Sequence, residues 1–397
     1  MNRQELLNQA EEHIFSTGLT DSGSKLCKSN MRYGLAKIHY WQQKMGLYPL
    51  AVFIGSPDMT ITRNRGRWMS GFGYGGKISW GKGEEEVIVL DTKPNACGML
   101  VGGMYKLPDE HDLLKKIEHF QTHVNIIDDV EVEWDFSKGN HFIDIFSAKP
   151  RRDVNLPPYL FIIHGSANEL KEKSPCKWGL YWDESASLKE AATKFDTPFG
   201  MLYLAEGKNA QRFFKLYQFA HNFSKKKREL VAKHLFCDYE LIFNENHQGL
   251  LNYNEILLGC HFIDDFHNKL YPLTLRSDLP AYLLRGKPNL SCEVIDALGF
   301  ENRSKKLGVY DYLEKANIIP HGGGYVFPHL LNVEEVYEVG EKRYFKTDVA
   351  NDRGKQIISN TRDIPYQFRG REVLLKVMEL DMAEIVAKLI PLYVVKV

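Results

Sequence analysis

The apolar residues of this chain fall into short runs, and this pattern limits the folds open to it. Runs typical of buried strands occur at 51–54, 86–90, 142–146 and 159–163. None approaches the roughly 20 apolar residues that a membrane-spanning helix needs, so we expect no membrane contact. Helices and strands do not alternate regularly along the chain, which predicts an α+β fold rather than a βαβ fold.

Helices are predicted where apolar residues keep helical spacing. The first 50 residues form a predicted N-terminal helical segment, and the remainder, 51–397, contains no repeat or linker and is expected to be a single catalytic domain. Within that domain the spacing predicts a helix over 108–123 and a long helix over 197–236. An amphipathic helix is expected over 373–389, followed by a terminal strand at 392–395. The glycine-rich stretch 63–76 is expected to be a loop or an irregular strand.

The charge balance excludes one class of protein. The chain has 51 Lys and Arg residues and 51 Asp and Glu residues, so its formal net charge is zero. This excludes a large basic protein that coats nucleic acid. Nucleic acid would have to bind local basic clusters, of which four occur: 63–67, 225–228, 303–306 and 369–371. Clusters of this kind are more often solvated faces than nucleic-acid sites. The polar N-terminus resembles no secretory signal, and we expect a cytoplasmic protein.

The scattered cysteines suit neither a disulfide scaffold nor a zinc knuckle, but the histidines form a pattern. His141 precedes one predicted strand and His164 ends the next, so the two imidazoles can converge. Cys97 lies in a turn between proline and glycine, and His247 lies in a polar segment. A thiolate with three imidazoles would suit Mn, Zn or Fe. Each of these residues also has a simple structural explanation, which the sequence alone leaves open.

A second motif is built around His321, which is followed by Gly322, Gly323 and Gly324. Three glycines leave the backbone N–H groups open to close approach by a phosphate. A histidine there is suited to accept a phosphoryl or nucleotidyl group on a ring nitrogen, or to act as acid or base. The alternative is a glycine-rich turn with an incidental histidine. Near the C-terminus, Lys396 follows an apolar strand that could hold it in a site.

Taken in order, these motifs resemble the RtcB-type RNA-splicing ligases. Those enzymes use GTP and manganese to join RNA 3′-phosphate or 2′,3′-cyclic phosphate ends to 5′-hydroxyl ends, in tRNA splicing or RNA repair. The similar segments are Cys-Gly-Met at 97–99, Asn-His-Phe with Asp at 140–144, His-Gly-Ser at 164–166, Asn-His-Gln at 246–248, His-Gly-Gly-Gly at 321–324, and the Pro-Leu and Val-Lys pairs at 391–396.

The resemblance implies an RtcB-like fold, with mixed sheets and helices around a central cleft for metal and nucleotide. It makes His321 the nucleophile that is guanylated by GTP. One or two Mn²⁺ ions would be bound by Cys97, His141, His164 and His247. The nucleotide would be contacted by Asn140, His141, Phe142, Asp144, His247, Gln248, Gly322, Gly323, Gly324, Tyr366 and Lys396. The implied partners are GTP, RNA ends and a possible activating protein, with the chain itself a monomer.

Several positions depart from the family pattern. Pro94 stands where the family has a metal-bridging aspartate, and Asp91 lies three residues earlier. Asp144 replaces a glutamate, Tyr325 replaces an arginine, and Ala167 follows the His-Gly-Ser motif where the family has another arginine. Two alternatives therefore stand beside the ligase: a metal-dependent RNA phosphodiesterase or cyclic phosphatase, and a degenerate protein that binds RNA without catalysis.

Overall fold

The computed structural model describes residues 2–340, 342–350 and 354–397, and its centre is an eleven-stranded mixed sheet. The first two strands pair in parallel and every other pair in this sheet is antiparallel. In spatial order the strands are β1 (Ile14–Ser16), β2 (Val52–Thr60), β3 (Tyr74–Ser79), β13 (Glu255–Leu258), β12 (Glu240–Asn252), β5 (Cys97–Met104), β9 (Tyr159–Gly165), β8 (Phe142–Pro150), β23 (Ala383–Val395), β16 (Ala281–Gly286) and β15 (Tyr271–Leu273).

Both faces of this sheet are buried. Along β9, Phe161 and Ile163 point into one hydrophobic core, whereas Leu160 and Ile162 point into another. Because side chains alternate between the two faces of a strand, a sheet covered on both sides needs continuous apolar runs. This explains the runs seen in the sequence, and the predicted α+β class is confirmed.

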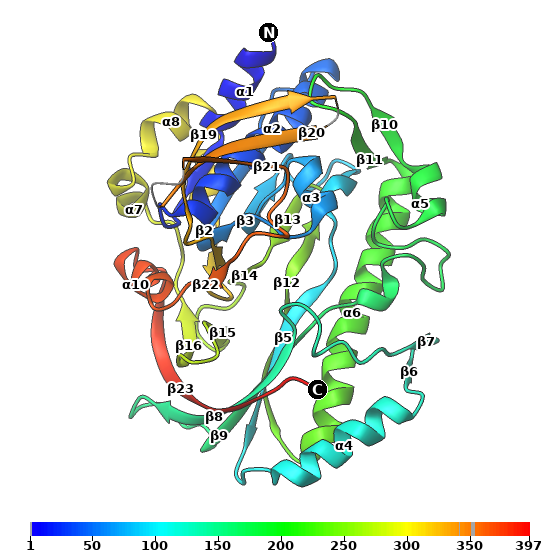
Figure 1. The fold of residues 1–397 in the computed structure, drawn as a ribbon, viewed down its shortest axis with the longest axis vertical. Helices are drawn as coiled ribbons and strands as arrows, with labels where there is room; N and C mark the ends of the chain where they lie inside the picture. The colour runs from blue at the N-terminus through cyan, green and yellow to red at the C-terminus, as the bar shows by residue number, and fades with distance from the viewer. Residues whose placement is uncertain (1, 341, 351–353) are drawn as a thin grey trace.

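Long helices cover the sheet (Figure 1). The helix α6 (Lys208–Phe236) runs alongside β5 and β12, and α4 (Glu110–Thr122) packs on α6. The first 50 residues contain α1 (Arg3–Glu12), the edge strand β1 and α2 (Ser22–Lys44), and their apolar residues join the core formed by residues of the sheet. The remaining helices are α3 (Arg65–Ser70), α5 (Ala186–Ala191), α7 (Cys292–Ala297), α8 (Glu301–Lys306), α9 (Tyr310–Glu314) and α10 (Glu372–Glu379), with short 3₁₀ turns at Leu90–Thr92 and Asn168–Leu170.

Smaller sheets surround the central one. They are formed by β10 (Thr193–Phe195), β11 (Leu202–Glu206) and β4 (Val87–Val89); by β14 (Cys260–Phe262) and β17 (Ile318–Pro320); by β18 (Tyr325–Val326) and β22 (Gln367–Phe368); by β19 (Leu330–Val339), β20 (Lys342–Val349) and β21 (Lys355–Ile358); and by β6 (Ile126–Ile127) and β7 (Val130–Glu131). The pair β14–β17 ends beside the histidine-glycine motif and so positions it.

Two predicted helices are wrong in part. The helix expected over 197–236 begins only at Lys208, because residues 202–206 form β11 and Gly207 adopts a positive φ of 54°. The helix expected over 373–389 ends at Glu379. Asp381 then turns the chain with a φ of 47°, and the residues from Ala383 form β23 between β8 and β16. Tertiary strand pairing overrides the helical spacing there.

The glycine-rich stretch 63–76 is more regular than expected, since it contains α3 and the start of β3. Within the described residues, the structure contains no helix that is long and apolar enough to cross a membrane.

Candidate metal centre and adjoining cavity

Three neighbouring strands of the central sheet bring a thiol and two imidazoles together. Cys97 begins β5, His164 lies near the end of β9, and His247 lies on β12. Since β5 pairs with both other strands, the ligand atoms converge: Cys97 Sγ lies 3.1 Å from His164 Nε2, which lies 3.2 Å from His247 Nε2. All three residues are buried.

The hydrogen bonds of His164 fix which of its nitrogens can bind a metal. Its Nδ1 lies 2.8 Å from the carbonyl oxygen of Asn140, and a carbonyl only accepts, so Nδ1 carries the hydrogen. The Nε2 lone pair therefore points at Cys97 and His247. Burial, together with the neighbouring imidazoles, lowers the pKa of both His164 and His247 well below the usual value, so both rings are neutral.

This donor set fits a metal ion. A buried thiol and two neutral imidazoles are typical ligands of borderline ions such as Zn²⁺ and Fe²⁺, and the backbone carbonyl that orients His164 is the usual second partner of a metal-bound histidine. Ligands around a tetrahedral ion at the usual bond lengths lie roughly 3.3–3.6 Å apart, close to the distances above. His247 Nδ1 is buried with no hydrogen-bond partner among the described residues, so His247, unlike His164, has no second partner that orients its ring.

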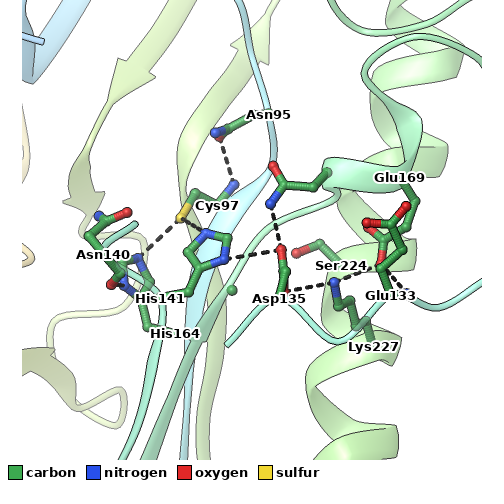
Figure 2. Close-up of polar contacts among 12 residues, drawn as sticks. Asn95, Cys97, Glu133, Asp135, Asn140, His141, His164, Glu169, Ser224 and Lys227 are labelled. Carbon is green, nitrogen blue, oxygen red and sulfur yellow. Dashed lines mark hydrogen bonds and ion pairs between the residues drawn. The ribbon is translucent and has the colours of Figure 1, made fainter. Parts of the chain in front are cut away.

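His141, also predicted as a ligand, borders this group rather than joining it. Its Nε2 lies 3.9 Å from Cys97 Sγ, and its Nδ1 lies 3.1 Å from the carboxylate of Asp135. Figure 2 shows His141 between the sulfur and Asp135, which is contacted in turn by Lys227. Burial alone would lower the pKa of His141, but the bonds to Asp135 and Cys97 raise it to about 9. A protonated imidazole nitrogen has no lone pair to offer a metal, so His141 would bind one only after it loses this proton.

His321 lies directly against the metal group. Its ring centroid is 4.1 Å from that of His247, and its Nδ1 lies 3.0 Å from a carboxylate oxygen of Asp58 on β2. Asp58 also accepts hydrogen bonds from the Ser56 hydroxyl and from the backbone N–H of Gly322. The carboxylate therefore holds Nδ1 protonated and leaves Nε2 as the nitrogen with a free lone pair.

The glycines after His321 have a structural reason in addition to the predicted one. A Cβ on Gly323 would lie 2.5 Å from the carbonyl oxygen of Arg369, and a Cβ on Gly324, whose φ is 65°, would lie 2.3 Å from that of Asp58. The buried guanidinium of Arg369 donates to the carbonyl oxygens of Gly323 and Asp58 and to the carboxylate of Asp21. The motif is thus packed against two other backbone segments, whether or not a phosphate is bound.

A cavity opens beside His321 and contains most of the residues that the resemblance assigns to the nucleotide. It is lined by Asn140, Phe142, Asp144, His164, His321, Gly322, Gly323, Gly324, Tyr325 and Lys396, among others. One oxygen of Asp144 is buried without a hydrogen-bond partner, and burial raises the pKa of this carboxyl to about 7 although Lys396 opposes the shift. Lys396 donates to the carbonyl oxygen of His141 at 2.7 Å.

Four residues expected at the nucleotide do not line this cavity: His141, His247, Tyr366 and Gln248. The guanidinium carbon of Arg63 lies 3.9 Å from the ring centroid of Tyr366, and Tyr366 is 38% exposed. Gln248 contacts the Tyr74 hydroxyl and lines a second, neighbouring cavity that is described below.

The expectation that the basic clusters form solvated or RNA-binding faces is wrong for four of their residues. Arg67 is buried and donates to the carbonyl oxygens of Thr92 and Lys93. Lys227 and Arg228 are buried: Lys227 pairs with Asp135 and Glu169, and Arg228 donates to Ser224, Asn244 and Asn246. Arg369 is buried as described above.

Sequence reasoning missed Asp58 and Asp135, which orient His321 and His141. Both are single acidic residues without a surrounding motif, and only the fold brings them to their partners. The one signal at Asp58 is its position in a buried strand, where an unpaired carboxylate is costly.

Comparison of the chain with models of known protein families gave no match, and comparison with curated proteins gave none either.

We predict that the protein binds about one equivalent of a divalent ion, because the three ligand atoms surround one position. His164→Ala and His247→Ala should each reduce the bound metal to about a tenth or less, since each removes one of three protein ligands. Metal analysis after incubation with Mn²⁺, Zn²⁺ or Co²⁺ and desalting measures this.

Cys260→Ser is the matched control for Cys97→Ser, because Cys260 is equally buried but lies outside the group. Cys97→Ser should lose metal and the control should keep it. Equal metal content in the two serine variants would contradict the assignment.

Proposed function

We propose that this protein is a metal- and GTP-dependent RNA ligase that joins RNA 3′-phosphate or 2′,3′-cyclic phosphate ends to 5′-hydroxyl ends through a guanylated His321. The observation that carries the proposal is the position of His321. It faces a cavity with Asn140, Asp144 and Lys396, its Nδ1 is held by Asp58, and it adjoins a candidate metal group. A nucleophilic histidine needs this combination of an oriented ring and a nearby charge-neutralising centre.

The cavity suits a guanine base. Guanine presents two adjacent N–H donors on its Watson–Crick edge, whereas adenine presents an acceptor at the equivalent ring nitrogen. Asp144 offers an unpartnered carboxylate oxygen to accept such donors, and Lys396 offers a donor for the base carbonyl oxygen. Phe142 provides an apolar surface for the ring.

The proposed ligation has three steps. His321 Nε2 attacks the α-phosphorus of GTP, an N–P bond forms, and pyrophosphate leaves. An oxygen of the RNA 3′-phosphate then attacks this phosphorus, which breaks the N–P bond and restores the imidazole. The RNA 5′-hydroxyl finally attacks the activated 3′-phosphate, loses its proton, and releases GMP. A cyclic phosphate must first be opened by hydrolysis. Asp58 stabilises the ring of His321 by keeping the proton on Nδ1 throughout.

When bound at Cys97, His164 and His247, a divalent ion would supply positive charge beside the reacting phosphates. The ligand types favour a borderline ion and the resemblance favours Mn²⁺, so both belong in the assays.

We predict that incubation with α-labelled GTP and a divalent ion transfers the label to the protein. The bond should be acid-labile and stable to base, as expected for a phosphoramidate. His321→Ala should abolish labelling, because it removes the accepting nitrogen. His261→Ala is the control, since His261 is buried nearby but its Nε2 is engaged by the carbonyl oxygen of Pro272.

Labelling that persists in His321→Ala would contradict the nucleophile assignment. Absence of label, combined with hydrolysis of an RNA cyclic phosphate without GTP, would instead favour the phosphodiesterase alternative. A protein without metal, label or hydrolysis would be the degenerate RNA-binding alternative.

We also predict that Asp144→Asn weakens labelling by GTP by about tenfold to a hundredfold, because an amide loses the charged acceptor for the guanine donors. The ionised carboxylate is the better acceptor and the pKa of Asp144 is raised to about 7. Apparent affinity for GTP should therefore fall as the pH drops through about 7, and this pH dependence should vanish in the variant. A titration of labelling against GTP concentration at several pH values measures both effects. An unchanged pH profile in Asp144→Asn would refute this role.

A further inference from the structure

A second chamber lies on the other side of the metal group from the cavity beside His321. Tyr74, Gly139, Asn140 and Tyr325 line both spaces and form the wall between them. Cys97 and His141 face only the second chamber, whereas His164 and His321 face only the first. The metal group therefore stands where the two spaces meet.

The second chamber is positively charged. Arg63, Arg67, Lys138 and Lys171 line it, and none of its described lining residues is an aspartate or glutamate. Arg67 is only 4% exposed, and its guanidinium is fixed by donation to the carbonyl oxygens of Thr92 and Lys93. Glu184 and Asp135 act on the charge of Lys171 from outside the chamber, but no acid lines the chamber itself, so an anion bound between these cations would be favoured.

A neutral donor, the hydroxyl of Ser166, also lines this chamber. Ser166 is fully buried, and its hydroxyl has no hydrogen-bond partner among the described residues although it lines the space. Lys171 is half-buried near Cys97, and burial lowers the pKa of its ammonium group. The volume, about 390 Å³, is large against the roughly 30 Å³ that one water molecule occupies, so a phosphate group has room.

A second divalent ion has few ligands here. Among the described residues, one group of three metal-ligating side chains forms, and Pro94 provides no ligand side chain at the start of this turn. Asp135, the nearest acid to His141, is already engaged by Lys227, His141 and Asn168. Charge on a phosphate in the second chamber must therefore be neutralised mainly by side chains.

We propose that the second chamber binds the terminal phosphate of the RNA 3′ end. Arg67 and Lys171 neutralise its charge in place of a second metal ion, and Ser166 donates a hydrogen bond to it. The inference rests on the proposed function. The first cavity holds the guanylate, the second holds the 3′-phosphate, and the two meet at the metal group and His321. A local group of cations also suits a chain whose formal net charge is zero, because the overall charge provides no attraction for RNA.

The test compares two short oligoribonucleotides of one sequence that carry the same net charge, one with a 3′-phosphate and one with a 5′-phosphate. Binding to the full-length protein, loaded with one equivalent of Mn²⁺ and without GTP, is measured by fluorescence anisotropy at physiological salt. We expect the 3′-phosphate RNA to bind about tenfold more tightly. Lys171→Met and Ser166→Ala should each remove most of this preference. Lys173→Met, which changes an exposed lysine outside the chamber, should leave it intact.

Equal affinity for the two RNAs, or a full preference in both Lys171→Met and Ser166→Ala, would overturn the proposal. Guanylation of His321 is measured separately on the same preparations, by labelling with GTP in the absence of RNA. A protein that is guanylated but shows no 3′-phosphate preference overturns the chamber assignment alone. A protein that prefers the 3′-phosphate but is never guanylated supports the chamber and overturns the nucleotide step alone.

Discussion

The buried guanidinium of Arg369 is the interaction on which the geometry around His321 depends. It pairs with Asp21 at the start of α2, and it donates to the backbone carbonyl oxygens of Asp58, Met59 and Gly323. A buried charge is tolerated only when it is paired and its donors are satisfied. Here that requirement joins the N-terminal helices, strand β2 and the histidine-glycine motif, and so it holds Asp58 against His321.

The metal group depends on a different constraint, the register of three antiparallel strands. Met99 on β5 pairs with His164 on β9, and Cys97 pairs with Gln248 on β12. A shift by one residue in either pairing would turn a ligand to the opposite face of the sheet. Because this sheet is buried on both faces, such a shift would also expose apolar side chains, so packing of the core enforces the geometry of the site.

The sequence predicted what depends on local pattern. The strand that follows His141, the strand that carries His164, the helix of 108–123 and the α+β class follow from apolar spacing, and all are present. The convergence of Cys97, His164 and His247 was also predicted. Long-range pairing was not predictable: β23 carries helix-like spacing but is held between two strands, and Asp58 and Asp135 lie far along the chain from the histidines they orient. The sequence predicts surface positions for Lys227, Arg228 and Arg369, because no neighbouring residue in the sequence indicates their buried partners.

The proposed guanylation of His321 can be tested by a crystal structure of the protein after reaction with GTP and a divalent ion. We expect electron density that is continuous between His321 Nε2 and a phosphorus atom, with the guanine edge against Asp144 and the ion at Cys97, His164 and His247. A nucleotide bound elsewhere, or one whose phosphates point away from His321 with the ion in place, would contradict it.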